Sequence, residues 1–163
     1  MDDSGLKLLL SQKYKERLAK RVIARNFINE IIPNLFLGDL EGALANKDNF
    51  DIIINLSTYK YVTIPLQYFI SIEDTPKQEI VEYINVCNKI IEDGLKNNKK
   101  ILVHCFAGKS RSSSIILGYL MTTRNWTYEE AFDFVNKQRT SDNPIQPNVG
   151  FIYQLKKFVT KKS

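Results

Sequence analysis

A chain of 163 residues suits a single domain with one hydrophobic core and leaves little room for a second folded domain. Hydrophobic residues make up 44% and charged residues 25%, as in ordinary soluble globular proteins, and no apolar run approaches the about 20 residues that a membrane-spanning helix needs. The net charge of +5 comes from lysines spread along the chain, without an aromatic-plus-basic pattern, and a single histidine excludes a histidine-cluster metal site. We therefore expect no metal, no other cofactor and no nucleic acid partner.

Residues 6–25 are predicted to form a basic amphipathic helix, because apolar side chains recur at four-residue steps among lysines and arginines. Packing on the protein's own domain, with the charged face in water, is the favoured role. Two sharper alternatives are contact with an anionic membrane surface and binding to calmodulin. We predict a boundary between this N-terminal helix, assigned to residues 1–28, and a domain over residues 29–163.

Two short strands are predicted within residues 31–38, because Pro33-Asn34 favours a turn between two apolar runs. Asp39 is then in the position of a helix N-cap. A short helix through Leu44 is expected to follow it.

Buried strands are predicted where continuous apolar, β-branched runs occur, at residues 52–56, 68–72 and 101–103. Residues 61–64 are predicted to add an edge strand. Helical patterns alternate with these strands, which indicates an α/β fold.

Helix periodicity and boundary residues predict the remaining elements. Four helices are expected: from Thr75-Pro76 to about Gly94, from Ser110 to Met121, from Thr127 through at least Val135, and from Val149 to Val159. Thr127 with Glu130 is a capping box, and Pro144 and Pro147 break the chain before the last helix. Cys87 falls on the apolar face of the first of these helices.

The stretch from His104 to Ser112 joins the strand 101–103 to the next helix, so a cysteine and an arginine bracket a loop at a helix N-terminus. Backbone N–H groups of such a loop converge on one point and the helix dipole adds positive charge, which makes an anion site. Arg111 supplies a planar fork for two phosphate oxygens. The same field stabilises a thiolate, so we predict that Cys105 attacks a phosphate ester. The phosphate-binding loop consists of Phe106, Ala107, Gly108, Lys109, Ser110 and Arg111.

Three neighbours support this interpretation. Gly108 can adopt a positive φ and let the backbone approach the phosphate closely. The hydroxyl of Ser112 is placed to donate a hydrogen bond to the Cys105 sulfur and help it leave as a thiolate. His104 directly precedes the nucleophile, so we interpret it as a loop-orienting residue rather than a general base. The alternative is a small buried cysteine beside an ordinary strand-to-helix turn.

Phosphate-ester cleavage through a cysteine also needs an acid for the leaving oxygen and then a base for the attacking water. Glu73 and Asp74 follow a predicted strand at the end of the sheet where the cysteine loop emerges. Both are candidates, and local chemistry leaves the choice open. The alternative is a surface acid pair that caps the helix expected at Pro76.

The string from His104 to Ser112 resembles the signature His-Cys-x-x-Gly-x-x-Arg-Ser of the cysteine-dependent protein tyrosine phosphatases, and its surroundings resemble the small dual-specificity branch. Further matches run from Asn29 to about Val159: Ile32–Gly38, Gly118–Met121, Glu130-Ala131, Arg139 and Ile145–Phe151. The general acid of that family is an aspartate upstream of the cysteine, and the pattern falls on Asp74 rather than Glu73. One departure is Ser112-Ser113-Ser114, where small or apolar residues are more usual at the last two places.

The resemblance implies a central, mostly parallel sheet of about five strands flanked by helices, with residues 29–163 as the catalytic domain. The helix predicted from the periodicity of residues 6–25 is an extra N-terminal element of this fold. It implies a protein phosphatase that hydrolyses phosphotyrosine and phosphoserine or phosphothreonine through a phospho-cysteine intermediate. Phosphorylated proteins are the expected partners, with a mitogen-activated protein kinase as one candidate.

Two other functions stay open. Lys109 and the basic N-terminal helix motivate a phosphatase for phosphoinositides or other polyanionic non-protein phosphates. However, lipid phosphatases of this superfamily usually have a second loop lysine where this chain has Phe106. The other alternative is a phospho-binding module that does not turn over.

The expected location is the cytoplasm, with the nucleus as a second candidate. The sequence starts Met-Asp-Asp, without the basic and apolar regions of a secretory signal. A thiolate nucleophile in a chain of two cysteines favours a reducing compartment.

Overall fold

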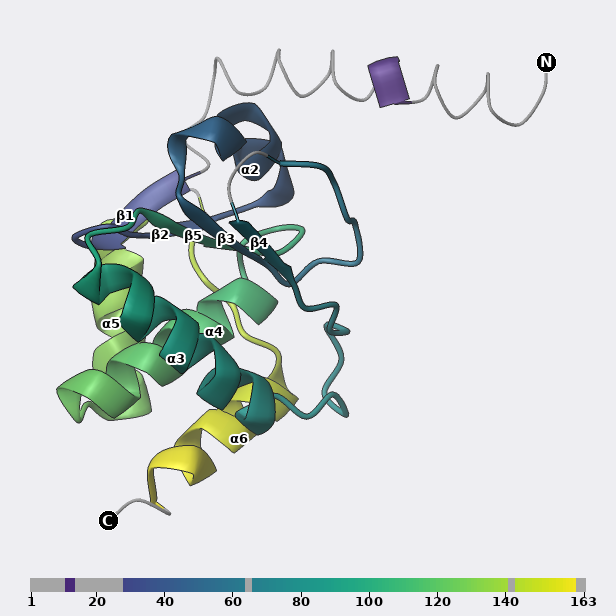
Figure 1. The fold of residues 1–163 in the computed structure, drawn as a ribbon. Helices are drawn as coiled ribbons and strands as arrows, with labels where there is room; N and C mark the ends of the chain where they lie inside the picture. The colour runs from purple at the N-terminus through teal and green to yellow at the C-terminus, as the bar shows by residue number, and fades with distance from the viewer. Residues whose placement is uncertain (1–10, 14–27, 64–65, 141–142, 161–163) are drawn as a thin grey trace.

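The computed structural model describes residues 11–13, 28–63, 66–140 and 143–160, without the side chains of residues 159 and 160. A five-stranded sheet with the order β1-β2-β5-β3-β4 lies within them (Figure 1). Its strands are β1 (Ile28–Ile32), β2 (Leu35–Gly38), β3 (Ile52–Asn55), β4 (Leu66–Phe69) and β5 (Ile101–His104). β1 and β2 pair antiparallel and the other neighbours pair parallel, which confirms the predicted mostly parallel sheet.

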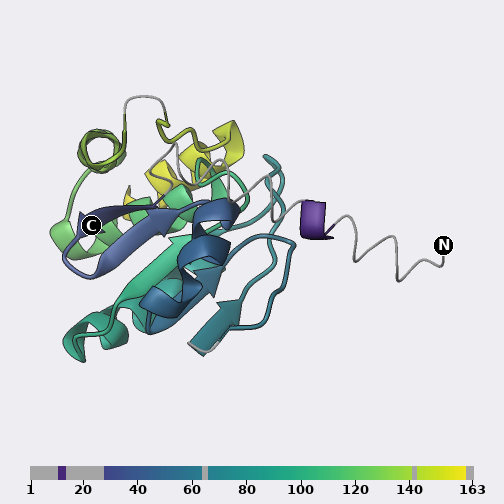
Figure 2. The same cartoon turned by 90° about the horizontal axis from the view of Figure 1, so that it is seen from above.

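Helices cover the sheet on both faces (Figure 1). They are α2 (Leu40–Asn46), the 3-10 turn η1 (Lys47–Asn49), α3 (Val81–Lys96), α4 (Arg111–Arg124), α5 (Tyr128–Gln138) and α6 (Val149–Thr160). Among the described residues, the short α2 and η1 lie on the face seen in Figure 2, and α3 to α6 lie on the opposite face. No helix in the described ranges is both long and apolar enough to cross a membrane. Of the N-terminal helix predicted over residues 6–25, only residues 11–13 are described, and these are helical.

The central strand β5 leads into the loop that begins with Cys105, and all four residues of the strand are buried. Ile101 and Val103 pack into the large core that α3 and α4 cover. Leu102 points the other way, into a smaller cluster with Ala43 and Phe50 beneath α2. Because both faces are covered, the strand is apolar at successive positions rather than at alternate ones.

The turn between β1 and β2 matches the prediction from Pro33-Asn34. Asn34 adopts φ 68°, a left-handed conformation that asparagine tolerates. Beyond β2, the side chain of Asp39 accepts a hydrogen bond of 2.7 Å from the backbone N–H of Gly42, so Asp39 caps α2 as expected. The capping box of α5 is also confirmed, with both reciprocal hydrogen bonds between Thr127 and Glu130 present.

The strand predicted over residues 68–72 is displaced. β4 begins at Leu66, ends at Phe69 and lies at the sheet edge, where Leu66 is 56% exposed. It is therefore not covered on both faces, as the apolar run had suggested. The backbone N–H of Ile70 still donates to the backbone carbonyl of Asn55 (2.9 Å). Beyond Ile70 the chain leaves the sheet and leads to Asp74.

The edge strand predicted over residues 61–64 is wrong where the structure describes it, because residues 61–63 form no strand. Side chains at the end of β3 organise this loop instead. Asn55 Nδ2 donates to the Tyr59 carbonyl (2.8 Å), and the Tyr59 N–H donates to Ser57 Oγ (3.1 Å). Within the predicted strand itself, the Tyr61 carbonyl accepts from Gln67 Nε2 (2.6 Å), so a side chain occupies a backbone group that a sheet ladder would otherwise need.

Helix α3 begins at Val81 instead of at Thr75-Pro76. The residues before it form a loop in which the Gln78 N–H donates to the Thr75 carbonyl (3.1 Å). Gln154 of α6 then accepts a hydrogen bond of 2.8 Å from the Ile80 N–H. The side chain of Gln154, distant in sequence, therefore takes the place of a local cap, and α3 begins later in the chain than predicted.

Candidate active site

The loop after β5 turns directly into α4, whose first residue is Arg111. Three buried serines follow, and two of them bind the loop from within the helix. Ser113 Oγ donates to the carbonyls of Lys109 (2.5 Å) and Ser110 (3.0 Å), and Ser114 Oγ donates to the Ser110 carbonyl (2.6 Å). Hydroxyls at these unusual positions therefore hold the loop carbonyls and do not point at the sulfur.

The loop closes tightly against the neighbouring corner between β2 and α2. Gly108 has φ +69°, and a Cβ on it would lie 2.8 Å from the Gly38 carbonyl oxygen, so both backbone conformation and space favour glycine. On the same side, the Leu40 N–H donates to the Phe106 carbonyl (3.1 Å). The corner at the end of β2 therefore sets the shape of the loop.

The sulfur of Cys105 lies at the base of this loop, and the residue is only 2% exposed. Ser112 Oγ is 3.1 Å from Sγ, and the Gly108 N–H donates to Sγ over 3.3 Å. The Gly108 N–H stabilises negative charge on sulfur, and the Ser112 hydroxyl does so when it is the donor. The structure thus brings together the cysteine, the glycine and the serine that the sequence singled out.

His104 is fully buried and has a partner on each ring nitrogen. Nδ1 lies 3.0 Å from the Cys105 carbonyl, which can only accept, so Nδ1 carries the proton. Nε2 then accepts from the Tyr61 hydroxyl (2.7 Å). Burial lowers the pKa of His104 to about 4, although the bond to Cys105 opposes this, so the ring is neutral at physiological pH. The geometry agrees with a loop-orienting residue.

Arg111 lies at the rim of the loop and is partly exposed. Its Nη1 donates to the Ile72 carbonyl over 3.2 Å. Its Nε is buried and has no hydrogen-bond partner among the described residues. A phosphate oxygen is a fitting acceptor for such a donor.

The two acid candidates separate in space. Asp74 Oδ1 accepts a hydrogen bond of 2.7 Å from Ser110 Oγ, within the loop, and another of 2.9 Å from Asn148 Nδ2. Glu73 instead lines a neighbouring surface pocket, together with Lys77 and other residues at the start of α3. The geometry therefore favours Asp74, as the resemblance implied.

The other loop residues are spread around the rim. Phe106 is 59% exposed, Ala107 is exposed and Lys109 is half-buried. The backbone carbonyl of Lys109 accepts from the Gln146 N–H (2.8 Å), so the segment before α6 also braces the loop.

Two charged residues near the loop, Asp39 and Arg139, are buried. Arg139 Nη1 donates to the Leu37 carbonyl (3.3 Å). Burial is the largest effect on Asp39 and raises the pKa of its carboxyl to about 6, an effect that the Arg139 guanidinium opposes. Burial also lowers the pKa of Arg139.

The Asp39→Asn variant is expected to change how stability depends on pH. The pKa of Asp39 rises from 3.8 to about 6 on folding, so protonated Asp39 favours the folded state. This contribution to the free energy of unfolding is fully present below about pH 4 and is lost as pH rises through about 6. The difference corresponds to at most about 3 kcal/mol. Asparagine keeps an acceptor for the Gly42 N–H but has no charge to bury, so the variant should gain on the wild type between pH 4 and pH 7.

Urea unfolding of both proteins at pH 4 and pH 7 measures this gain. An equal difference in the free energy of unfolding at the two pH values would show that Asp39 is not protonated preferentially in the fold.

Local sequence patterns do not indicate two of these contacts. Tyr61 falls in the segment predicted as an edge strand, and nothing near it shows that its hydroxyl reaches His104. Asn148 belongs to the segment Ile145–Phe151 that resembles the family, and nothing in that segment shows a contact with Asp74. Its contact with Asp74 spans 74 residues of sequence and depends on where α6 begins.

Comparison with known proteins gives consistent results. Residues 35–161 match the family model described as dual specificity phosphatase, catalytic domain. The "Putative tyrosine phosphatase 123R" of Invertebrate iridescent virus 6 is 34% identical over 130 residues, which cover 79% of this chain and 89% of that protein. "Tyrosine-protein phosphatase yvh1" of Schizosaccharomyces pombe is 36% identical over 138 residues, but they cover only 41% of that longer protein and 80% of this chain.

Solved structures have the same fold. Human DUSP28 superposes with a TM-score of 0.76 at 23% identity, covering 85% of this chain and 97% of that one. The human tyrosine phosphatase-like serine/threonine/tyrosine-interacting protein gives 0.72 at 25% identity, covering 85% and 99%.

Proposed function

From the premise that this chain belongs to the dual specificity phosphatase family, we propose that Cys105, Arg111, Asp74 and Ser112 carry its reaction. The protein is a cysteine-dependent phosphatase of that class and acts on phosphorylated proteins, hydrolysing phosphotyrosine and phosphoserine or phosphothreonine. The observation that carries the residue roles is the loop itself, in which Ser112 and the Gly108 N–H surround the Cys105 sulfur.

In the first step, the Cys105 thiolate attacks phosphorus, so an S–P bond forms as the bond from phosphorus to the ester oxygen breaks. Asp74 gives its proton to that oxygen, which leaves as an alcohol or phenol. Arg111 and the loop N–H groups hold the equatorial oxygens, where negative charge is spread in the transition state. The products are a phospho-cysteine and an Asp74 carboxylate.

In the second step, Asp74 takes a proton from water while the water oxygen attacks phosphorus. The S–P bond breaks, inorganic phosphate leaves and the thiolate returns. Ser112 Oγ, 3.1 Å from Sγ, donates to the leaving sulfur. A Ser112→Ala variant that breaks down its phospho-enzyme at the wild-type rate would contradict this role.

The proposed catalytic domain is residues 29–163, with residues 1–28 as a separate N-terminal segment. The family model supports this division, since its match begins at residue 35. A role for residues 6–25 at a membrane surface or with calmodulin stays a prediction. The proposed location is the cytoplasm or nucleus, supported by the free thiols of Cys87 and Cys105.

A mitogen-activated protein kinase is the candidate substrate in this proposal. A relative named "MAP kinase phosphatase with leucine-rich repeats protein 3", from Dictyostelium discoideum, is 33% identical over 165 residues, although these cover only 18% of that protein. The name describes that relative, and the shared catalytic chemistry supports the same substrate class here.

A substrate panel tests the proposed function. Phosphate release is measured from a phosphotyrosine peptide, a phosphothreonine peptide of the same sequence and a soluble inositol phosphate. Both peptides should be turned over, and kcat/KM for the inositol phosphate should be lower by at least about 10-fold. A preference for the inositol phosphate would favour the non-protein alternative. Binding of the peptides without turnover would favour the binding module.

A further inference from the structure

The side chain of Phe106 is exposed directly beside the candidate nucleophile. Cys105 is only 2% exposed, whereas Phe106, the next residue, is 59% exposed. The backbone of Phe106 is held in place, because its carbonyl accepts a hydrogen bond of 3.1 Å from the Leu40 N–H at the start of α2. The loop therefore presents an aromatic ring to solvent at its mouth, the opening above the Cys105 sulfur.

A second exposed apolar side chain borders this mouth from α6. The Asn148 backbone N–H donates to Ser110 Oγ in the loop (3.0 Å), and Asn148 Nδ2 donates to Asp74 (2.9 Å). Val149 follows directly and is 73% exposed. Because α2 and α6 lie on opposite faces of the sheet, Phe106 and Val149 flank the mouth from opposite sides (Figure 1).

Apart from Asp74, the side chains around this mouth offer little polar character. Ala107 is exposed but has no polar group, and Lys109 is half-buried. A single exposed apolar side chain on a protein surface needs no explanation, but Phe106 and Val149 together form an apolar rim around one anion site. Such a rim above a charged base matches a substrate whose phosphate is attached to an apolar group.

Phosphotyrosine and phosphothreonine differ in what reaches the apolar rim. In phosphotyrosine, a planar ring separates the phosphate from the peptide backbone, so the ring lies at the rim when the phosphate fills the loop. In phosphothreonine, the ester oxygen is attached to Cβ, which brings the polar backbone against the same apolar side chains. Contact between two aromatic rings is favourable, whereas a peptide group pressed onto an apolar surface loses hydrogen bonds to water.

We propose that Phe106 and Val149 bind the phenyl ring of phosphotyrosine and make this site prefer phosphotyrosine over phosphothreonine. The proposal rests on the function proposed above, in which Cys105 cleaves phosphate esters, and deepens it by assigning the preferred substrate class. Phe106 is the main specificity-determining residue, because its ring offers the larger apolar surface and an aromatic face.

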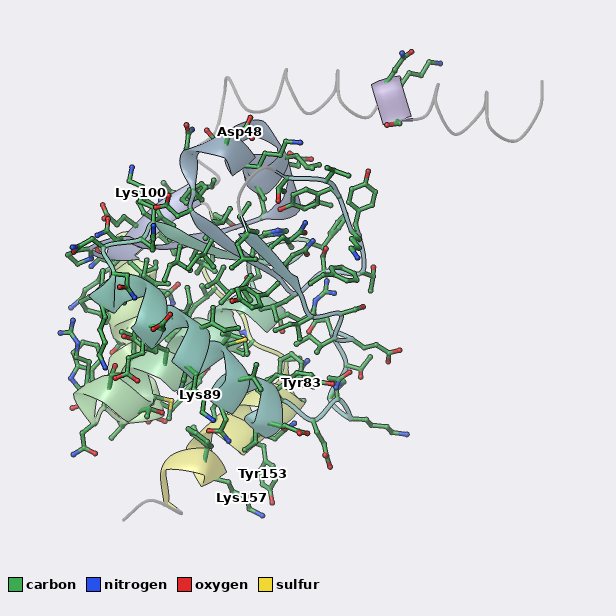
Figure 3. All side chains as sticks on the ribbon, in the orientation of Figure 1. Asp48, Tyr83, Lys89, Lys100, Tyr153 and Lys157 are labelled. Atoms are coloured by element: carbon green, nitrogen blue, oxygen red, sulfur yellow. The ribbon has the colours of Figure 1, made fainter. Side chains whose placement is uncertain are left out.

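Three variants test the apolar rim. Phe106→Ala removes the ring, Phe106→Tyr keeps it, and Val149→Ala shortens the side chain on the opposite side. Because both residues are exposed, these changes remove little buried surface from the fold. The matched control is Tyr153→Ala, since Tyr153 is an aromatic residue of nearly equal exposure (60%) that points outward from α6, with its ring centroid 4.7 Å from Lys157 Nζ (Figure 3).

The full-length proteins are assayed on a phosphotyrosine peptide and on a phosphothreonine peptide of the same sequence. The change in the ratio of the two kcat/KM values reports the rim, because a phenol leaves more readily than an alcohol in wild type and variants alike. Phe106→Ala should lower kcat/KM about 10-fold for the phosphotyrosine peptide and less than about 2-fold for the other peptide. Phe106→Tyr and Tyr153→Ala should keep the wild-type ratio, and Val149→Ala should lower it less than Phe106→Ala does. Inhibition by inorganic phosphate, which has no ring, should be unchanged in all four variants.

An unchanged ratio in Phe106→Ala would overturn the proposal. Equal losses on both peptides, or weaker inhibition of Phe106→Ala by inorganic phosphate, would overturn it as well, since a residue that only shapes the loop gives those results. In each of these cases the proposed function stands, because the wild type still turns over both peptides. The proposed function fails separately, if Cys105→Ser turns over both peptides as fast as the wild type, and the proposal for the rim then falls with it.

Discussion

The Cys105→Ser variant is expected to lose turnover by about 10⁴-fold or more while it still binds phosphopeptides. A serine hydroxyl at this position stays protonated at neutral pH, so the nucleophile is lost. The loop N–H groups and the guanidinium of Arg111, which hold the phosphate in the proposed mechanism, are unchanged. Release of p-nitrophenol and calorimetric titration with a phosphotyrosine peptide measure the two properties on the same protein.

Two further variants make this result specific. Cys87 is the other free thiol, fully buried in the core with a pKa that burial raises to about 12, so Cys87→Ala should keep its turnover. Adding Arg111→Met to Cys105→Ser should abolish the peptide binding that the single variant keeps, because a bidentate, charged donor is removed. Turnover that survives in Cys105→Ser but is lost in Cys87→Ala would show that the nucleophile is Cys87 and not Cys105.

The parts of the fold that sequence patterns predicted are those that local chemistry determines. The apolar run of β5, the Pro33-Asn34 turn and the capping box at Thr127 each specify their structure within a few residues. The loop from Cys105 to Arg111 belongs to this group, since it is one short segment between a strand and a helix. Such elements were predicted with nearly the observed bounds.

The errors arose where distant side chains decide the structure. The start of α3 depends on Gln154, which supplies the acceptor for the Ile80 N–H, and no local pattern shows this. The loop after β3 depends on Asn55 and Ser57, whose side chains take the place of strand pairing. Likewise, local sequence could not distinguish Glu73 from Asp74, because the contacts that separate them come from Ser110 and from Asn148, which are distant in sequence.

The Asp74→Asn variant is expected to lower kcat/KM for a phosphothreonine peptide by about 10²-fold or more. Asparagine keeps an oxygen that accepts from Ser110 and Asn148, so the loop that carries residue 74 retains its hydrogen bonds. The asparagine side chain has no acidic proton to give to the leaving group. The loss on p-nitrophenyl phosphate should be smaller because its leaving group departs as a stable anion. The basic limb of the pH profile should also disappear, since asparagine does not titrate.

Glu73→Gln is the matched control, because Glu73 is the adjacent acid, is exposed and lines the neighbouring pocket. Its kinetic constants and pH profile should equal those of the wild type. If Glu73→Gln lost activity and Asp74→Asn kept it, the general acid would be Glu73, and the hydrogen bonds at Asp74 would only hold the loop in place. The leaving-group dependence decides between these outcomes, since general acid catalysis contributes most when the leaving oxygen is most basic. Removal of a purely structural contact would slow both substrates alike.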